Sequence, residues 1–149
     1  MTRLDVALAA VTRLASDTAP IIYFVEAHPR YDLLVMNVFQ RIANGAIIGV
    51  TSVITLSEVL IQPLRQGNAV LQQDYRDLLL HSANFQTLSI TAEIAERGAE
   101  LRARYNLRTP DALQVATGLV AGCEAFLTND RGLQRVTELR VLVLDDLEL

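Results

Sequence analysis

The chain has 149 residues, of which 51% are hydrophobic and 20% charged, and its formal net charge is −4. This length and composition suit one domain with a full core, and they exclude the disordered and fibrous classes. The negative charge provides no bulk attraction to nucleic acid or anionic membranes, so an RNA ligand would need a local basic patch or a partner subunit.

The single cysteine and the uncharged stretches indicate the compartment. Cys123 is the only cysteine, which excludes an intramolecular disulfide and a cysteine-rich zinc module and is typical of a reducing compartment. The longest uncharged stretch, residues 42–57, falls short of the roughly 20 apolar residues that span a bilayer. The N-terminal apolar run is too short for a signal core. We therefore expect a cytoplasmic protein without a membrane partner.

The first half of the chain is expected to alternate helices and strands, judged from apolar periodicity, caps and β-branched runs. In chain order we expect an extra N-terminal helix over 1–11, a strand over 12–16, a helix from 17 to about 28, a helix over 31–42, a strand over 46–50, and a helix from 51 or 52 to about 64.

The second half continues this alternation. We expect a helix over 68–82, a strand over 85–89, helices over 92–105 and 109–121, a strand over 125–128, a helical turn over 130–135, a strand over 140–144 and an acidic tail over 145–149. Strands separated by helices predict an α/β fold, here a three-layer α/β/α sandwich with a mostly parallel central sheet. No linker or repeat divides residues 1–149, so we expect a single domain.

Four acidic residues stand where a strand gives way to a helix, or just inside a helix after an apolar run: Asp17, Glu58, Asp111 and Asp130. Ligand sites of α/β folds form outside the carboxyl ends of the strands. Acids that converge there repel one another and acquire raised pKa values unless a cation lies between them. The pattern therefore predicts a site for a hard divalent metal.

Each acid alone also has a structural explanation. Asp17 can cap a helix, Asp111 can interact with a helix dipole, and Asp130 can belong to a turn. Glu58 lies among apolar residues that make its helix hydrophobic nearly all round, which makes a surface salt bridge a poor explanation. The prediction rests on the four acids together.

Mg²⁺ and Mn²⁺ prefer oxygen ligands, and a metal-bound water can attack phosphorus. Thr18, Thr128 and Asn129 lie beside the acids and can orient ligands or waters. The chain lacks the P-loop, dinucleotide-binding, nucleophile-elbow and H-E-x-x-H motifs, and its two histidines have no partner at zinc spacing.

All 13 basic residues are arginine. Arg97 and Arg104 follow Glu93 and Glu100 by four residues, which predicts ion pairs on a helix surface. Phosphate contact by these arginines, or by Arg108 or Arg131 near the acids, is the alternative interpretation.

Four blocks in order resemble the PIN-domain family, especially the bacterial VapC-type toxins. They are D-T-A-P-I-I-Y-F-V-E-A-H-P-R-Y at 17–31, T-S-V-I-T-L-S-E-V-L at 51–60, T-P-D-A-L-Q-V-A-T-G-L-V-A-G-C at 109–123 and A-F-L-T-N-D at 125–130. Each block is weak alone, whereas the ordered set is specific and covers essentially the whole chain. One departure is Ala19, where the family often has asparagine.

The resemblance implies a Mg²⁺- or Mn²⁺-dependent endoribonuclease in which Asp17, Glu58, Asp111 and Asp130 are the catalytic metal ligands. It also implies a toxin that forms a homodimer and is inhibited by a cognate antitoxin. Three alternatives stay open: a catalytically idle PIN-like module that binds RNA or protein, a metal-dependent phosphohydrolase for another substrate, and a plain α/β scaffold.

Overall fold

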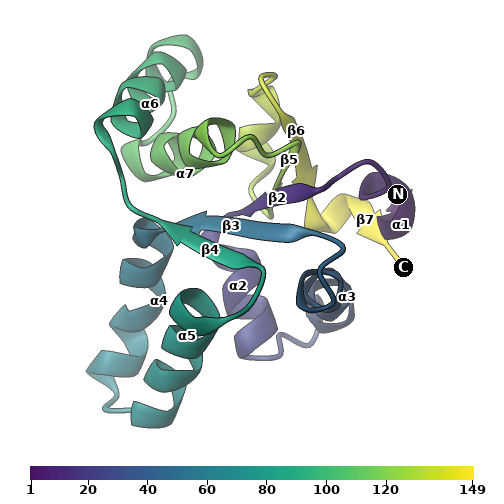
Figure 1. The fold of residues 1–149 in the computed structure, drawn as a ribbon, viewed down its shortest axis with the longest axis vertical. Coiled ribbons are helices and arrows are strands. Elements are labelled where there is room, and N and C mark those ends of the chain that lie inside the picture. The colour runs from purple at the N-terminus through teal and green to yellow at the C-terminus, as the bar shows by residue number, and fades with distance from the viewer.

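A computed structural model describes residues 1–149 and contains a five-stranded, all-parallel sheet in the order β4-β3-β2-β5-β6. Helices flank this sheet, so the predicted three-layer α/β/α architecture is confirmed (Figure 1). The strands are β2 (Arg13–Ser16), β3 (Ile48–Ser52), β4 (Phe85–Leu88), β5 (Ala125–Thr128) and β6 (Arg140–Val143).

Two groups of helices cover the two faces of the sheet (Figure 1). One face carries α2 (Thr18–Val25), α3 (Asp32–Ala43), α4 (Val53–Arg65) and α5 (Ala69–His81), and the other carries α6 (Ala92–Tyr105) and α7 (Thr109–Val120). None of the helices is both long and apolar enough to cross a membrane.

The central strands supply both cores because their side chains alternate between the faces. Leu14 and Leu127 join the larger core beneath α2–α5, whereas Ala15 and Phe126 join the core beneath α6 and α7. Gly118 allows α7 to lie directly on β2, since a Cβ atom there would stand 2.8 Å from the Cβ atom of Ala15. This contact sets how closely α7 approaches the sheet.

The two ends of the chain differ from the prediction. The helix expected over 1–11 is confined to α1 (Leu4–Ala7), and Thr2–Arg3 forms a strand, β1. Where a short acidic tail was expected over 145–149, a 3₁₀ turn (Leu144–Asp146) leads into β7 (Leu147–Glu148), which pairs in parallel with β1. The buried Leu147 anchors this pairing, which joins residues at opposite ends of the chain.

The ion pairs predicted on α6 are wrong in register. Arg97 bonds to Glu100 at 2.7 Å, and Arg104 bonds to Glu138 at 3.2 Å. Arg104 can reach Glu138 because the segment after the 3₁₀ helix η1 (Arg131–Arg135) returns to the C-terminal end of α6, where Tyr105 also bonds Glu138. The spacing of charges along the helix did not reveal Glu138 as a partner of Arg104, because Glu138 lies outside that helix.

The Glu124 carboxylate ties β2 to the loop before β5, at the edge opposite the carboxyl ends of the strands. It accepts hydrogen bonds at 2.8 Å from the backbone N–H groups of Thr12 and Arg13 and from the Thr12 hydroxyl. These bonds lower the pKa of Glu124, that from the Arg13 N–H most strongly. A lowered pKa stabilises the fold above the unfolded value of about 4.5 and loses this effect as the pH falls.

We expect Glu124→Gln to lower the free energy of unfolding by about 1 kcal/mol at neutral pH, because the variant lacks the charge-assisted bonds of the exposed carboxylate. This difference in unfolding free energy from wild type should shrink as the pH falls toward about 3, where wild-type Glu124 is itself protonated. Urea unfolding at both pH values measures this. Glu96→Gln, at an exposed site with no bonding partner, is the control. A deficit that does not change with pH would contradict the prediction.

Candidate active site

The predicted acids come from four segments and lie near the carboxyl ends of the parallel strands, a region called the carboxyl edge below. Asp17 directly follows β2, and Asp130 follows β5, its neighbour in the sheet. Glu58 lies in α4, which follows β3 on the other side of β2, and Asp111 lies in the first turn of α7. The parallel arrangement thus brings residues that are far apart in the sequence to one edge.

Asp17 is the most enclosed of the four acids. Its carboxylate accepts hydrogen bonds from the Thr18 backbone N–H at 3.0 Å and from the Thr128 hydroxyl at 2.7 Å. Burial raises the pKa of Asp17 despite these bonds, and repulsion from Asp111 and Glu58 raises it further. Asp111 and Glu58 are therefore close enough to Asp17 to repel its charge.

Glu58 is exposed, although its helix is hydrophobic nearly all round in sequence, and it forms no ion pair. The helix α4 buries Thr55, Val59 and Pro63, but its apolar residue Leu64 is 56% exposed. What connects Glu58 to the site is the Thr18 hydroxyl, which donates to Glu58 Oε1 at 3.1 Å.

A basic residue of the chain, Arg108, is bonded to one of the acids. The Nε atom of Arg108 is 3.1 Å from Asp111 Oδ2, and the side chain of Arg108 is 80% exposed. Bonding to Asp111 raises the pKa of Arg108, and the charges of Asp130 and Glu58 raise it further. One exposed guanidinium is therefore bonded to Asp111 and lies near enough to Asp130 and Glu58 to feel their charges.

Asp130 is exposed and bonds away from the other acids. Its Oδ1 atom accepts from the Gly132 N–H at 2.8 Å, which caps η1. Thr128 connects it to Asp17, because the Thr128 oxygen accepts from the Asp130 N–H at 3.1 Å while its proton is donated to Asp17.

Asn129 faces away from the acids. Its Oδ1 atom accepts from the Asp145 N–H at 3.2 Å, and its Nδ2 atom lies 3.4 Å from the Tyr23 hydroxyl. It thus ties β5 to the C-terminal segment and to α2. Of the three neutral residues predicted to support the acids, Thr18 and Thr128 bond to them directly and Asn129 does not.

The donor set suits a hard divalent cation in its chemistry. All four side chains offer carboxylate oxygens. Burial, and to a smaller extent the charges of Asp111 and Glu58, raises the pKa of Asp17, and Arg108 is bonded to Asp111. In the conformation described, no three acidic, histidine or cysteine side chains are close enough together to hold one metal ion. Asp111 is bonded to Arg108 and Asp130 to Gly132 instead.

A buried polar network beneath the acids was missed by sequence reasoning. Gln114 of α7 bonds Ser52 at the end of β3 and Thr55 of α4, and all three side chains are at most 3% exposed. The only available signal was the presence of polar residues within the apolar blocks T-S-V-I-T and A-L-Q-V-A. That signal does not say which residues meet.

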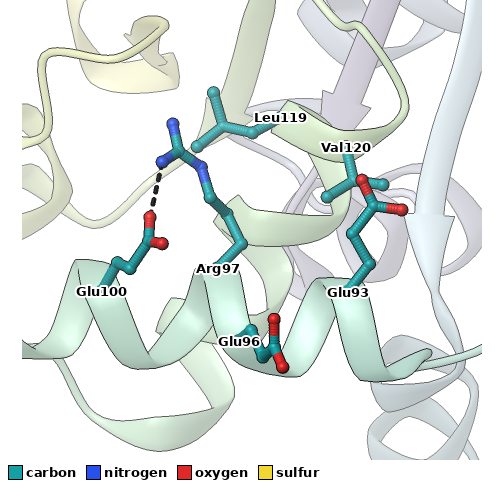
Figure 2. Close-up of a pocket in the computed structure, with 6 residues that line it drawn as sticks. All are labelled: Glu93, Glu96, Arg97, Glu100, Leu119 and Val120. Atoms are coloured by element: carbon teal, nitrogen blue, oxygen red, sulfur yellow. Dashed lines mark hydrogen bonds and ion pairs between the residues drawn. The ribbon is translucent and has the colours of Figure 1, made fainter.

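A hollow of about 380 Å³ on the surface lies elsewhere. It is lined by α6 and the C-terminal end of α7, as Figure 2 shows, and includes none of the four acids. Arg97 is bonded to Glu100 there, so it is not positioned to contact a ligand of the four acids (Figure 2). The residues that line this hollow are Glu93, Glu96, Arg97, Glu100, Leu119 and Val120.

The family model of the PIN domain matches residues 16–139. The chain belongs to the PIN-domain family. The matched range begins at the end of β2 and contains all four acids, whereas α1 and the β1–β7 pair lie outside it. Among curated proteins, none matches this PIN-domain chain in sequence.

Three solved structures share the fold of this PIN domain. VapBC2 from Rickettsia felis bound to a promoter DNA fragment aligns with a TM-score of 0.70 and 17% identity, over 89% of this chain and 98% of the other. A toxin–antitoxin complex from Klebsiella pneumoniae aligns with a TM-score of 0.68 and 23% identity, over 89% and 98%. DNA-bound VapBC from Salmonella typhimurium aligns with a TM-score of 0.63 and 15% identity, over 90% and 98%.

Proposed function

We propose that this PIN domain is a Mg²⁺- or Mn²⁺-dependent endoribonuclease that hydrolyses phosphodiester bonds of RNA. One observation carries the proposal: Asp17 is enclosed at the carboxyl edge of a parallel sheet, where burial and repulsion from Asp111 and Glu58 raise its pKa. A bound divalent cation offsets both costs. A site whose purpose was purely structural would not benefit from three mutually repelling acids.

The metal ligands in this proposal are Asp17, Glu58, Asp111 and Asp130. When bound, the metal supplies a Lewis acid for a phosphoryl oxygen and a water of lowered pKa. The chain itself holds Asp17 in place through the Thr128 hydroxyl. Glu58 and Asp130 are exposed, so the site is open to solvent and suits an unpaired RNA strand whose backbone is accessible.

The biological role proposed is that of the toxin in a toxin–antitoxin pair. Its support is the similarity in fold to chains of three toxin–antitoxin complexes, together with membership of the PIN-domain family. A cytoplasmic homodimer inhibited by a cognate antitoxin belongs to the same proposal.

The second candidate is an idle PIN-like module that binds RNA or protein. The observation that favours it is the lack of any three side chains arranged to hold a metal ion, with Arg108 bonded to Asp111 instead. In the nuclease proposal, Asp111 would serve as a metal ligand and its ion pair with Arg108 would compete with the metal for the same carboxylate.

Cleavage of a pool of structured RNAs, and of a matched DNA pool, by the purified protein distinguishes these functions. We expect cutting of RNA with Mg²⁺ or Mn²⁺ and none with EDTA. Cutting of DNA alone would assign the protein to another class of phosphohydrolase. No cutting and no change in melting temperature with metal would favour the binding module.

Arg108→Gln is expected to tighten Mn²⁺ binding about twofold to fivefold, since the variant removes a cation that competes for Asp111 through an exposed ion pair. Isothermal titration calorimetry measures this affinity. Arg104→Gln removes the same charge from an exposed ion pair with Glu138 and should leave the affinity unchanged. Equal effects of both variants would show that only net charge matters.

A further inference from the structure

We infer that Gln114 is a positioning residue for Glu58: its buried amide sets the direction in which the Thr18 hydroxyl donates and so holds the Glu58 carboxylate at the carboxyl edge beside Asp17. The inference rests on the proposed function, because the position of Glu58 matters there as that of a metal ligand. No contact between Gln114 and any of the four acids is involved.

The Gln114 side chain joins three elements at the base of the site. From α7 its Nε2 atom lies 2.7 Å from the Thr55 hydroxyl in α4 and 3.3 Å from the Thr18 hydroxyl in α2. Its Oε1 atom accepts from the Ser52 hydroxyl at 2.6 Å. The Gln114 side chain is 3% exposed, and every buried polar side-chain atom of the protein has a partner.

Ser52 determines which way the amide faces. As the N-cap of α4, its hydroxyl oxygen accepts from the Ile54 N–H at 3.2 Å, which leaves the hydroxyl proton to be donated. That proton needs an acceptor, and Gln114 Oε1 is the acceptor within reach. The two N–H bonds of the amide must then point at Thr18 and Thr55.

The remaining hydroxyl protons follow from this orientation. Thr51 donates to the Ser16 carbonyl at 2.9 Å, so at 2.8 Å from Thr55 it can only accept. Thr55 accepts from Gln114 and donates to Thr51. Thr18 likewise accepts from Gln114. Its hydroxyl lies 3.3 Å from the Thr55 hydroxyl and 3.1 Å from Glu58 Oε1, and we assign its single proton to the carboxylate, which is the nearer and the charged acceptor.

A reversed amide would change the result at Glu58. Its oxygen would face Thr18 and Thr55 and accept their protons, and Glu58 would lose its donor. Because Glu58 is exposed and the Thr18 hydroxyl is its one side-chain partner, loss of this donor frees the carboxylate to leave the edge. Groups that orient metal ligands in this way typically contribute tenfold to a hundredfold to metal affinity.

The test is calorimetric titration of Mn²⁺ into wild type, Gln114→Met, Thr18→Val and the double variant. We expect each single variant to weaken Mn²⁺ binding about tenfold. The double variant should be no weaker than the singles, since both act through one hydrogen bond to Glu58. Thr18→Ser keeps the hydroxyl and should restore wild-type affinity.

Thr117→Val is the matched control, because Thr117 also has a buried hydroxyl on α7 but donates it to the Leu113 carbonyl at 2.8 Å. It should lower the melting temperature without changing Mn²⁺ affinity. If Gln114→Met does not fold, Ser52→Gly replaces it, since glycine still caps helices and only the hydroxyl that orients the amide is lost. This variant should also weaken Mn²⁺ binding.

Wild-type affinity within twofold in Gln114→Met, or in its Ser52→Gly replacement, would overturn the inference while leaving the nuclease proposal intact. A hundredfold loss in the double variant would also overturn it, because two independent effects would then multiply. A wild-type protein that binds no Mn²⁺ would instead overturn the metal-dependent function, and the role of Gln114 with it.

Discussion

Asp17→Asn is expected to lower RNA cleavage about 10³-fold or more, because in the proposed function it removes a metal ligand that acts with the other acids as a unit. The metal-free variant should nevertheless melt at a temperature equal to or above that of wild type at neutral pH. The physical reason is that burial and the charges of Asp111 and Glu58 raise the pKa of Asp17, so its ionised form opposes folding.

The pH dependence follows from the same shift. A group whose pKa is raised by folding favours the folded state at low pH and loses this contribution as the pH rises through its folded value. The advantage of Asp17→Asn should therefore be largest near neutral pH and shrink on acidification. Cleavage assays measure the loss of activity, and thermal melts from acidic to neutral pH measure the difference in stability between Asp17→Asn and wild type.

Asp32→Asn is the matched control, since Asp32 lies in the first turn of α3 and has no contact with the four acids. It should leave cleavage unchanged. A fall of several degrees in the melting temperature of Asp17→Asn would show that Asp17 serves mainly as the cap of α2, in which its side chain accepts from the Thr18 N–H. Retained cleavage would remove Asp17 from the site.

Gly118→Ala is expected to destabilise the protein by about 2 kcal/mol, although alanine favours helices over glycine. The added Cβ atom would stand 2.8 Å from the Cβ atom of Ala15 in β2, and neither atom is the end of a flexible chain. The helix α7 must then move away from β2. Because α7 carries Asp111 and Gln114, we expect weaker Mn²⁺ binding as well, measured by urea unfolding and calorimetry.

Gly98→Ala provides the comparison in the neighbouring helix α6. Its added Cβ atom would stand 3.0 Å from Leu113 Cδ2, the end of a side chain that can rotate. Alanine should then be neutral, or stabilising by up to about 1 kcal/mol through helix propensity. Equal costs at both positions would show that the contact between α7 and β2 does not set the position of the helix.

The alternation of helices and strands was readable from the sequence, and so was the position of Asp17 and Asp130 after neighbouring strands. Helix caps such as Thr91 and β-branched runs such as 125–128 are local signals, and the structure places α6 and β5 at the predicted residues. The carboxyl ends of parallel strands necessarily meet at one edge. Acids that follow such strands, as Asp17 and Asp130 do, can therefore be assigned to a common site from their positions in the sequence.

Other features depend on partners that no local pattern specifies. The pairing of β1 with β7 joins residues 2 and 147, and the sequence of either segment alone favoured something else. Glu58 is exposed in a helix whose composition is largely apolar. Part of that helix faces solvent, since the apolar residues Ile61 and Leu64 are exposed as well. Composition describes a whole helix, whereas packing selects one face of it.

Local patterns and the geometry of parallel strands were enough to predict the element types between the two chain ends and the parallel sheet, whereas the assignment of the four acids to one metal site stays a prediction. The bond from Arg108 to Asp111 and the reach of Gln114 to Ser52 and Thr18 emerged only from the folded arrangement. Gln114 is 62 and 96 residues from the latter two, and a buried hydrogen bond depends on orientation and distance in space.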